Sequence, residues 1–291
     1  MNIRAATRED APAFAELFAS LEEAVLGHTS LDELVVHAWW QGVDLATNTW
    51  LCEEEGTLVA GAFLQVHDSR GDWAGAVRPS EQRRGLGARL VELVERRLAE
   101  EKAKRTLSWT LAADERASEL FEQHGYREVR RFWDMAIDFG EDTPEPAAVI
   151  STFREEDARA FHAANEEAFA DHWESHPDPF EKWWERQRER TNYDPSLWFL
   201  IRDGDEVAAI CRNEMRASGG YVGSLGVRRP WRGRGYGRAL LHHSFREFRR
   251  RGAKRATLGV DASNPTGATH LYESVGMHVD MEAIVWEKTL G

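Results

Sequence analysis

The sequence predicts an α/β protein of two tandem domains, each with a mixed, largely antiparallel sheet flanked by helices. Three observations support this fold class. A glycine-rich motif occurs twice, at positions 82–87 and 232–237. The residues around each copy match in the same order along the chain, which is the signature of an internal duplication. The length of 291 residues suits two domains of roughly 100–150 residues each.

The glycine-rich motif reads Gln-Arg-Arg-Gly-Leu-Gly in its first copy and Arg-Gly-Arg-Gly-Tyr-Gly in its second. Each copy follows an apolar run that ends in Val-Arg, at 73–78 and 222–228, and precedes an amphipathic helical pattern. A glycine turn at the start of a helix directs free backbone N–H groups, and the positive end of the helix dipole, towards an anion. Each half is therefore predicted to hold a phosphate.

Other matched segments fix the number of domains. They are Trp39-Trp40 with Trp183-Trp184, Trp50-Leu51 with Trp198-Phe199, and 120–126 with 271–277. Between the halves, residues 140–146 are acidic and contain two prolines, which is typical of a linker. We therefore expect an N-terminal domain at 1–140 and a C-terminal domain at 147–291.

The second half shows the order of elements most clearly. Its predicted strands are 148–152, 197–202, 206–215, 220–227, 255–260 and 279–289. Its predicted helices are 155–170, 180–190, 237–250 and 265–275. Apolar residues at helical spacing define the helices, and Asp203-Gly204-Asp205 is a hairpin signal. Asn264 before Pro265 suggests an N-cap, and Gly276 suggests the end of that helix.

Composition narrows the class of function. The net charge of -13 argues against general nucleic-acid binding, which needs a basic face, and is compatible with a cationic substrate. No apolar run of about 18 residues and no signal peptide is evident, so we expect no membrane partner and a cytoplasmic location. Cys52 and Cys211 provide no disulfide framework and are expected to be buried structural thiols. No metal site is expected.

The element order, the motif after the fourth strand, and the pair Asn264 and Tyr272 downstream resemble the GCN5-related N-acetyltransferase (GNAT) superfamily. The resemblance covers nearly the whole chain as a tandem protein. It implies an acyl-CoA-dependent N-acyltransferase that moves an acetyl group from acetyl-CoA, its co-substrate, to a primary amine of a small molecule by direct attack. It also implies that acetyl-CoA binds where the fourth and fifth strands of a domain separate.

The resemblance assigns cofactor-binding roles to both halves, with the pyrophosphate on the turn and the pantetheine along the strand before it. The implied residues of the second half are Leu225, Gly226, Val227, Arg232, Gly233, Arg234, Gly235, Tyr236, Gly237, Arg238 and Asn264. Those of the first half are Val77, Gln82, Arg83, Arg84, Gly85, Leu86 and Gly87. The motif glycines are expected to let the backbone approach the phosphates closely, and Arg228 is a further candidate for added charge.

Attack of a neutral amine on a thioester needs a base, donors for the developing oxyanion, and an acid for the leaving thiolate. The resemblance implies Tyr272 as the general acid. Glu214 and His172 are candidate bases, because a histidine titrates near neutrality. The candidate substrate-binding residues are Asp171, Trp173 and Glu174, in a loop that also contains His176. These residues predict an acidic acceptor side that favours cationic amines.

The two halves differ at the positions that matter for chemistry. Phe121 stands where the second half has Tyr272, and Ala113 stands where it has Asn264. Because phenylalanine cannot protonate a thiolate, we expect the C-terminal domain to be catalytic and the N-terminal domain degenerate. The helix near 115 opens with Asp114, which favours capping rather than phosphate binding.

Other interpretations stay open at this point. A non-catalytic CoA-binding sensor or scaffold, and acetylation of a protein N-terminus or side chain, compete with small-molecule transfer. The acceptor could be a small amine, an aminoglycoside, an amino-acid derivative or a mycothiol precursor. A dinucleotide-binding fold is disfavoured, because no acidic residue is well placed for a ribose. A tandem repeat supplies its own packing, so a monomer or weak homodimer is expected.

Overall fold

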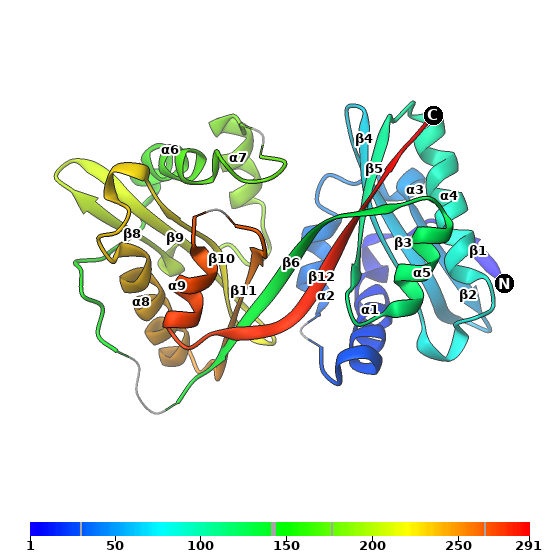
Figure 1. Cartoon of the computed structure of the whole chain (residues 1–291), viewed down its shortest axis with the longest axis horizontal. Helices are drawn as coiled ribbons and strands as arrows, with labels where there is room; N and C mark the ends of the chain where they lie inside the picture. The colour runs from blue at the N-terminus through cyan, green and yellow to red at the C-terminus, as the bar shows by residue number, and fades with distance from the viewer. Residues whose placement is uncertain (30, 141–143, 176, 265) are drawn as a thin grey trace. The chain divides into compact units, whose positions relative to one another are not determined.

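The chain forms two compact units in the computed structural model, which describes residues 1–29, 31–140, 144–175, 177–264 and 266–291. Unit 1 comprises Met1–Trp133 together with Met281–Gly291, and unit 2 comprises Asp134–Asp280. Figure 1 shows the chain coloured from its N-terminus to its C-terminus. Each unit is an α/β fold with a mixed sheet, which confirms the predicted fold class.

Unit 1 contains a sheet with the strand order β1-β2-β3-β4-β5-β12. Its strands are β1 (Asn2–Arg4), β2 (Thr49–Glu54), β3 (Thr57–His67), β4 (Arg70–Val77), β5 (Arg105–Leu111) and part of β12 (His278–Thr289). Its helices are α1 (Ala11–Leu26), α2 (Glu33–Trp39), α3 (Leu45–Asn48), α4 (Leu86–Glu100) and α5 (Glu115–Gln123). The pairing is antiparallel except between β4 and β5, which run parallel because α4 connects them.

Unit 2 repeats this arrangement with the strand order β7-β8-β9-β10-β11-β6. Its strands are β7 (Ser151–Thr152), β8 (Trp198–Asp203), β9 (Glu206–Arg216), β10 (Gly219–Val227), β11 (Arg255–Asp261) and part of β6 (Arg127–Asp138). Its helices are α6 (Ala158–Phe169), α7 (Phe180–Arg188), α8 (Tyr236–Arg250) and α9 (Ala268–Ser274). The predicted order of elements is therefore confirmed.

The last strand of each unit is drawn from the other half of the sequence. β12 pairs antiparallel with β5, from Ala283 opposite Leu111 to Thr289 opposite Arg105. At the end of β6, the Phe139 amide donates to the Lys254 carbonyl before β11 (2.8 Å). The compact units therefore differ from the expected contiguous ranges 1–140 and 147–291. The sequence could not reveal this, because a strand has the same pattern whichever sheet it joins.

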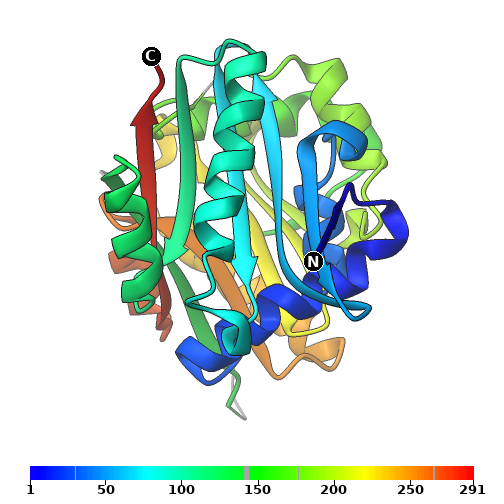
Figure 2. The same ribbon diagram turned by 90° about the vertical axis from the view of Figure 1, so that its right-hand side faces the viewer.

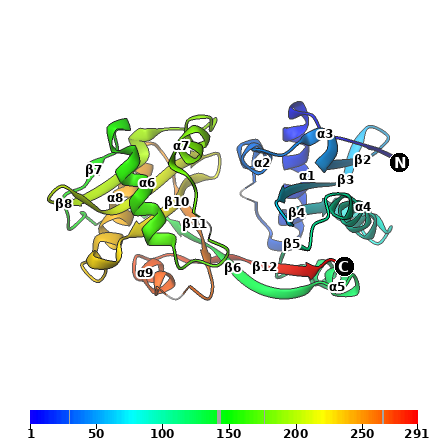
Figure 3. The ribbon, with the colours of Figure 1, turned by 90° about the horizontal axis from the view of Figure 1, so that it is seen from above.

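Two apolar layers sandwich the strands of unit 1. Leu90 and Val94 of α4 pack with Ala62 of β3 on one face, whereas Phe14 of α1 packs with Phe63 of β3 on the other. Neighbouring residues of a strand point to opposite faces, so β3 contributes to both layers. Figure 2 shows α4 in front of the strands of unit 1, and Figure 3 shows α1 and α4 on opposite sides of them.

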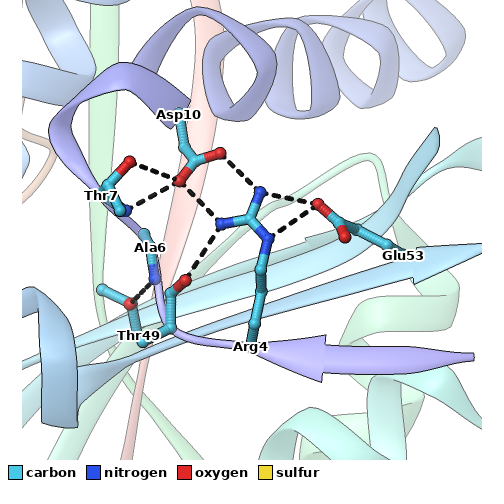
Figure 4. Close-up of polar contacts among 7 residues, drawn as sticks. Arg4, Ala6, Thr7, Asp10, Thr49 and Glu53 are labelled. Atoms are coloured by element: carbon cyan, nitrogen blue, oxygen red, sulfur yellow. Dashed lines mark hydrogen bonds and ion pairs between the residues drawn. The ribbon is translucent and has the colours of Figure 1, made fainter. Parts of the chain in front are cut away.

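A charged cluster fixes the start of unit 1 (Figure 4). The Arg4 guanidinium donates to both carboxylate oxygens of Asp10 (2.8 and 2.6 Å) and to Glu53 of β2 (3.0 Å). Asp10 also accepts from the Thr7 amide (2.8 Å), and the Ala6 amide donates to Thr49 (2.7 Å). Hydrogen bonds from Arg4 lower the pKa of Asp10 to about 2. The cluster therefore stays ionised at neutral pH and holds β1 against β2.

The helix that carries Tyr272 begins later than the sequence suggests. It starts at Ala268 with Gly267 as its N-cap (φ 75°), rather than at Pro265, which lies outside the described residues. Asn264 Oδ1 instead accepts from the Thr266 amide (2.8 Å) in a local turn. The prediction that Asn264 caps this helix is therefore wrong, because its side chain closes a turn upstream.

Two further expectations concern thiols and membranes. Cys52 and Cys211 are free and buried, as predicted. Burial raises the pKa of the Cys211 thiol to about 11, so this thiol stays protonated at neutral pH. Across the described parts of the chain, no helix is long and apolar enough to cross a membrane.

The strand exchange predicts that a change near the C-terminus weakens the N-terminal unit. Trp286 is buried against Phe121 (ring centroids 5.7 Å apart) and donates to Thr110 (2.9 Å). Trp286→Ala should cost about 3–5 kcal/mol of local stability, because it leaves a cavity in the core of unit 1. Hydrogen exchange followed by mass spectrometry should show lost protection in β5, with β11 protected.

The control is Val279→Ala, which changes an exposed residue at the start of β12 and should leave protection of β5 unchanged. If Trp286→Ala instead exposed β11 and spared β5, the assignment of this strand segment to unit 1 would be contradicted.

Candidate active site

A parallel pair of strands separates in each unit and opens the sheet. In unit 2, pairing between β10 and β11 covers Gly220 with Ala256 and Tyr221 with Thr257, although β10 continues to Val227. In unit 1, the corresponding pairing of β4 with β5 ends at Trp73. Backbone groups of a strand without a neighbour can pair with an extended ligand. The edge at 225–227 that we predicted for pantetheine lies in this separated segment.

A cavity of about 390 Å³ occupies the separated region of unit 1. Its walls come from β4, β5, α4 and α5, and include Trp109 and Phe121. The residues predicted for the first half that line it are Val77, Gln82, Arg83, Gly85, Leu86 and Gly87. Arg84 points elsewhere, since it pairs with Glu54 (2.9 Å) and with Glu81.

The glycine turn of unit 2 has the geometry of an anion site. Gly233 and Gly235 adopt φ of 78° and 79°, which glycine tolerates without steric cost. The helix α8 starts at Tyr236, and the Ala239 amide is bonded to the Gly235 carbonyl (3.0 Å). The amides of the first helical turn therefore have no intrahelical partner and point out of the helix. In unit 1, Arg83 takes the positive φ (65°) that Gly233 has in unit 2.

The last glycine of each motif lies against the next helix of its unit. A Cβ at Gly237 would lie 2.8 Å from Cδ2 of Leu271, and one at Gly87 would lie 2.9 Å from Cδ2 of Leu120. Both contacts are closer than van der Waals distance, so a larger residue would require the leucine side chain of α9 or α5 to shift. The close approach to phosphate that we expect of these glycines stays a prediction, and the structure adds this helix contact.

The arginines of the turn are not equivalent. Arg228 is held by Glu167 (2.6 Å) and Glu206 (2.7 Å), and Arg234 pairs with Asp203 (3.2 Å). Arg232 donates to backbone carbonyls, and Arg238 donates to the Ser274 hydroxyl (3.1 Å). Arg232 and Arg238 form no ion pair with any carboxylate in the described residues, so their charge remains available to an anion.

Tyr272 and Phe121 occupy equivalent positions with different surroundings. Phe121 is enclosed by Trp73, Tyr126 and Trp286 in an aromatic cluster (centroids 5.4, 4.9 and 5.7 Å away). Tyr272 is buried on α9, and its hydroxyl forms no hydrogen bond to a residue that the structure describes. Burial raises the pKa of Tyr272 above its ordinary value, so the phenol stays protonated.

Glu214 lies on β9 among three arginines. Its carboxylate contacts Arg190 (2.6 Å), Arg216 (2.8 Å) and Arg212 (3.6 Å). Burial acts to raise the pKa of Glu214, but the three guanidinium charges outweigh burial and hold the pKa below its ordinary value. Such a carboxylate is a weak proton acceptor. The alternation Arg-x-Glu-x-Arg at 212–216 was visible in the sequence, yet only its glutamate was recognised as a candidate.

A β-bulge distinguishes β10 from β4. The register between β10 and β9 shifts between Val222 and Ser224, which leaves Gly223 unpaired. In unit 1, β4 pairs with β3 without a shift, from Val77 to Arg70. A Cβ at Gly223 would lie 2.7 Å from Nη2 of Arg212, so the Arg212 guanidinium lies directly over the bulge. Sequence reasoning missed the bulge, because glycine-rich strands give no clear register.

The loop after α6 contains the remaining candidates. Both oxygens of Asp171 accept from Arg229 (2.7 Å each). The ring of His172 packs on Phe169 (4.5 Å), and burial lowers the pKa of this histidine. Trp173 and Glu174 are half-buried in the same loop, whereas His176 lies outside the described residues.

Two of the carboxylates on which the predicted acidic acceptor side depends are paired with arginines. Asp171 is neutralised by Arg229, and Glu214 faces three arginines. Tertiary contacts bring the positive charges from segments that the loop sequence does not contain.

Comparisons with known proteins agree with this geometry. The model of the acetyltransferase (GNAT) family matches residues 11–126 and 154–277. A mycothiol acetyltransferase of Thermobispora bispora is 29% identical, with 95% of this chain and 96% of that protein covered. A mycothiol acetyltransferase of Streptomyces scabiei is 31% identical, with 81% and 73% covered.

Solved structures show the same tandem arrangement. A GCN5-related N-acetyltransferase from Sphaerobacter thermophilus has a TM-score of 0.85 and 34% identity, with 99% of this chain and 95% of that chain covered. A tandem GNAT protein from the clavulanic acid biosynthesis pathway has a TM-score of 0.77 over 100% and 98% of the chains. At 13% identity, that likeness concerns the fold alone. The chain belongs to the acetyltransferase (GNAT) family and is an N-acetyltransferase with two copies of the fold.

Proposed function

We propose that unit 2 transfers an acetyl group from acetyl-CoA to a primary amine of a small molecule, and that unit 1 does not turn over. The observation that carries this proposal is that unit 2 has both the separated strands and a tyrosine, Tyr272, at the position expected for the general acid. Its protonated phenol has no hydrogen-bond partner in the described residues, whereas unit 1 has a buried phenylalanine at the same position. Membership of an acetyltransferase family disfavours a purely sensory role for the chain.

Each group in unit 2 then has one task in the transfer. The amine nitrogen bonds to the thioester carbonyl carbon, and the carbon–sulfur bond breaks. The turn 232–237 holds the pyrophosphate through backbone amides, and the open edge of β10 binds the extended arm. The Tyr272 hydroxyl gives its proton to the leaving sulfur, which avoids release of a free thiolate. Asn264, at the turn before α9, remains a candidate contact for the arm.

His172 suits the role of base better than Glu214. A base must be unprotonated to accept the proton that the amine loses, and an anionic base accepts it poorly when ion pairs stabilise its negative charge. The lowered pKa of His172 keeps it neutral at pH 7, whereas three ion pairs hold the Glu214 carboxylate. The loop position of His172, beside the candidate substrate contacts Trp173 and Glu174, supports this assignment.

The acceptor class follows from the relatives. Several are named mycothiol acetyltransferase, so a mycothiol precursor is the first acceptor to test. Acetylation of a protein N-terminus is the second possibility to test, because a peptide amine could attack the thioester in the same way. A panel of both classes, with thiol release followed by an indicator dye, separates them.

Removal of the Tyr272 hydroxyl should affect chemistry and spare binding. Tyr272→Phe should lower kcat by about 10²-fold, since general acid catalysis contributes on this scale, while calorimetry finds acetyl-CoA affinity unchanged. The matched change Phe121→Tyr in unit 1 should create no new activity, because Trp73 and Trp286 enclose that position. Unaltered kcat in Tyr272→Phe would rule out the assigned acid.

The phosphate role of the turn can be tested with one substitution in each unit. Gly235→Asp places a carboxylate at the first turn of α8, in a backbone conformation that aspartate tolerates better than most residues. Acetyl-CoA affinity of unit 2 should fall about tenfold, or about 1.4 kcal/mol. Gly85→Asp is the counterpart in unit 1 and should leave turnover intact. An unchanged dissociation constant in folded Gly235→Asp would remove the turn from the cofactor site.

The base assignment predicts a specific pH profile. The neutral histidine is active, so kcat/KM should fall as pH drops through a value below the ordinary 6.5 of a histidine. His172→Gln should lower the rate at pH 7 about 10²-fold and remove this acid limb. If Glu214 were the base, the limb would lie below 4.5, and Glu214→Gln, rather than His172→Gln, would abolish it.

A further inference from the structure

The face of β9 that lies under α6 and α7 carries an excess of positive charge. Arg212 pairs directly across the strands with Trp198, which packs on Phe161 of α6 and Trp183 of α7. Arg212, Glu214 and Arg216 point to this face because side chains alternate along a strand, and Arg190 joins them from the segment after α7. Asp134 of β6 adds a second carboxylate near Tyr221. Three guanidinium charges thus face two carboxylates.

Arg212 differs from the other two arginines of this cluster. Arg190 donates to Glu214 (2.6 Å), and Arg216 donates to Glu214 (2.9 Å) while stacking on Tyr221 (3.3 Å to the ring centroid). Arg212 forms an ion pair with Glu214 at 3.6 Å, but its guanidinium donates no hydrogen bond to any residue within the described ranges. Its side chain is 17% exposed. The guanidinium therefore keeps hydrogen-bond donors that a bound anion could occupy.

The position of Arg212 in the fold suggests that the amine substrate is its ligand. Its guanidinium lies over Gly223, at the bulge where β10 has just left β11. Gly259 of β11 faces the same region, since a Cβ there would lie 3.3 Å from Asp134 and 3.7 Å from the Tyr221 hydroxyl. A group bound by Arg212 would therefore lie beside the opening between the strands. Burial and the charge of Arg190 lower the pKa of Arg212, so this environment disfavours its positive charge.

We propose that Arg212 binds an anionic group, a carboxylate or a phosphate, of the amine that unit 2 acetylates. A guanidinium fork matches both anions through two parallel hydrogen bonds. Because Glu214 accepts its hydrogen bonds from Arg190 and Arg216, it does not occupy the donors of Arg212. The acceptor class is thus an amine that carries an acidic group a few bonds from its nitrogen. This inference rests on the proposed transfer in unit 2, and among its candidate acceptors it favours an anionic amine over a neutral mycothiol precursor.

The test uses acceptor pairs that differ only in the anion. One pair is an α-amino acid and its amide, for the carboxylate. The other is glucosamine 6-phosphate and glucosamine, for the phosphate. Wild type should prefer the anionic member of at least one pair, and Arg212→Gln should raise KM for that member about tenfold or more, with kcat and the neutral member little changed. Arg212→Lys should keep part of the preference.

The control is Arg202→Gln, which removes an arginine paired with Asp157 at the far end of β8 and should leave every KM unchanged. A wild-type preference for neutral members, including a neutral mycothiol precursor, would overturn the proposal. So would an equal loss of kcat for both members in Arg212→Gln, because that pattern indicates a role at the reacting carbonyl.

A binding measurement separates this inference from the proposed reaction. Inorganic phosphate is titrated by calorimetry into CoA-saturated protein, so that the glycine turns are already filled. Binding in wild type that weakens about tenfold or more in Arg212→Gln supports the anion site even if no amine is acetylated, in which case only the transfer proposal fails. Equal binding, or none, in both proteins contradicts the anion site. Melting curves for both proteins verify that the variant is folded.

Discussion

The separation of β10 from β11 after two residue pairs is the constraint on which the site of unit 2 depends. Up to Tyr221 the two strands share hydrogen bonds; beyond it, β10 pairs only with β9. The bulge at Gly223 lies at the same point and increases the local twist of the strand. An opening in a sheet leaves backbone donors and acceptors without partners. Backbone groups of this kind can pair with an extended ligand.

The same backbone surrounds different side chains in the two units. Unit 1 has the separated strands, the glycine turn and a cavity of about 390 Å³. Yet its pocket ends on Phe121, its strand β4 has no bulge, and Asp114 caps α5 (Oδ1 to the Ala117 amide, 3.1 Å). An aromatic cluster there offers packing where unit 2 offers a phenol. Both units thus share the scaffold, while unit 2 has the Tyr272 phenol at the position where unit 1 has Phe121.

Charge around the site cannot be read from segments in isolation. The loop 171–175 is acidic, but Arg229 pairs with Asp171 from a distant position. Glu214 is flanked in the sequence by Arg212 and Arg216, and the fold adds Arg190 from beyond α7. In a partly buried cluster each added guanidinium strengthens the local field, since the surrounding dielectric is low. These contacts pair the carboxylates of Asp171 and Glu214 with arginines, so neither carboxylate is a free negative charge.

The sequence by itself determined the fold class, the duplication, the order of elements and the two glycine turns before α4 and α8. These features depend on local signals: glycines that allow a positive φ, apolar periodicity, and hairpin residues, all of which act over a few neighbouring positions. The sequence also identified the difference between Tyr272 and Phe121, because an alignment of the two repeats places these residues at the same position.

Only the tertiary structure decided the exchange of β6 and β12 between the units, the bulge at Gly223 and the surroundings of Arg212. Each of these depends on pairing or packing between segments far apart in the chain. A strand pattern does not state which neighbour it joins, and a carboxylate does not reveal which guanidinium it meets. Strand pairing and charge pairing depend on the whole fold, because the native state is the arrangement in which many distant contacts are favourable together.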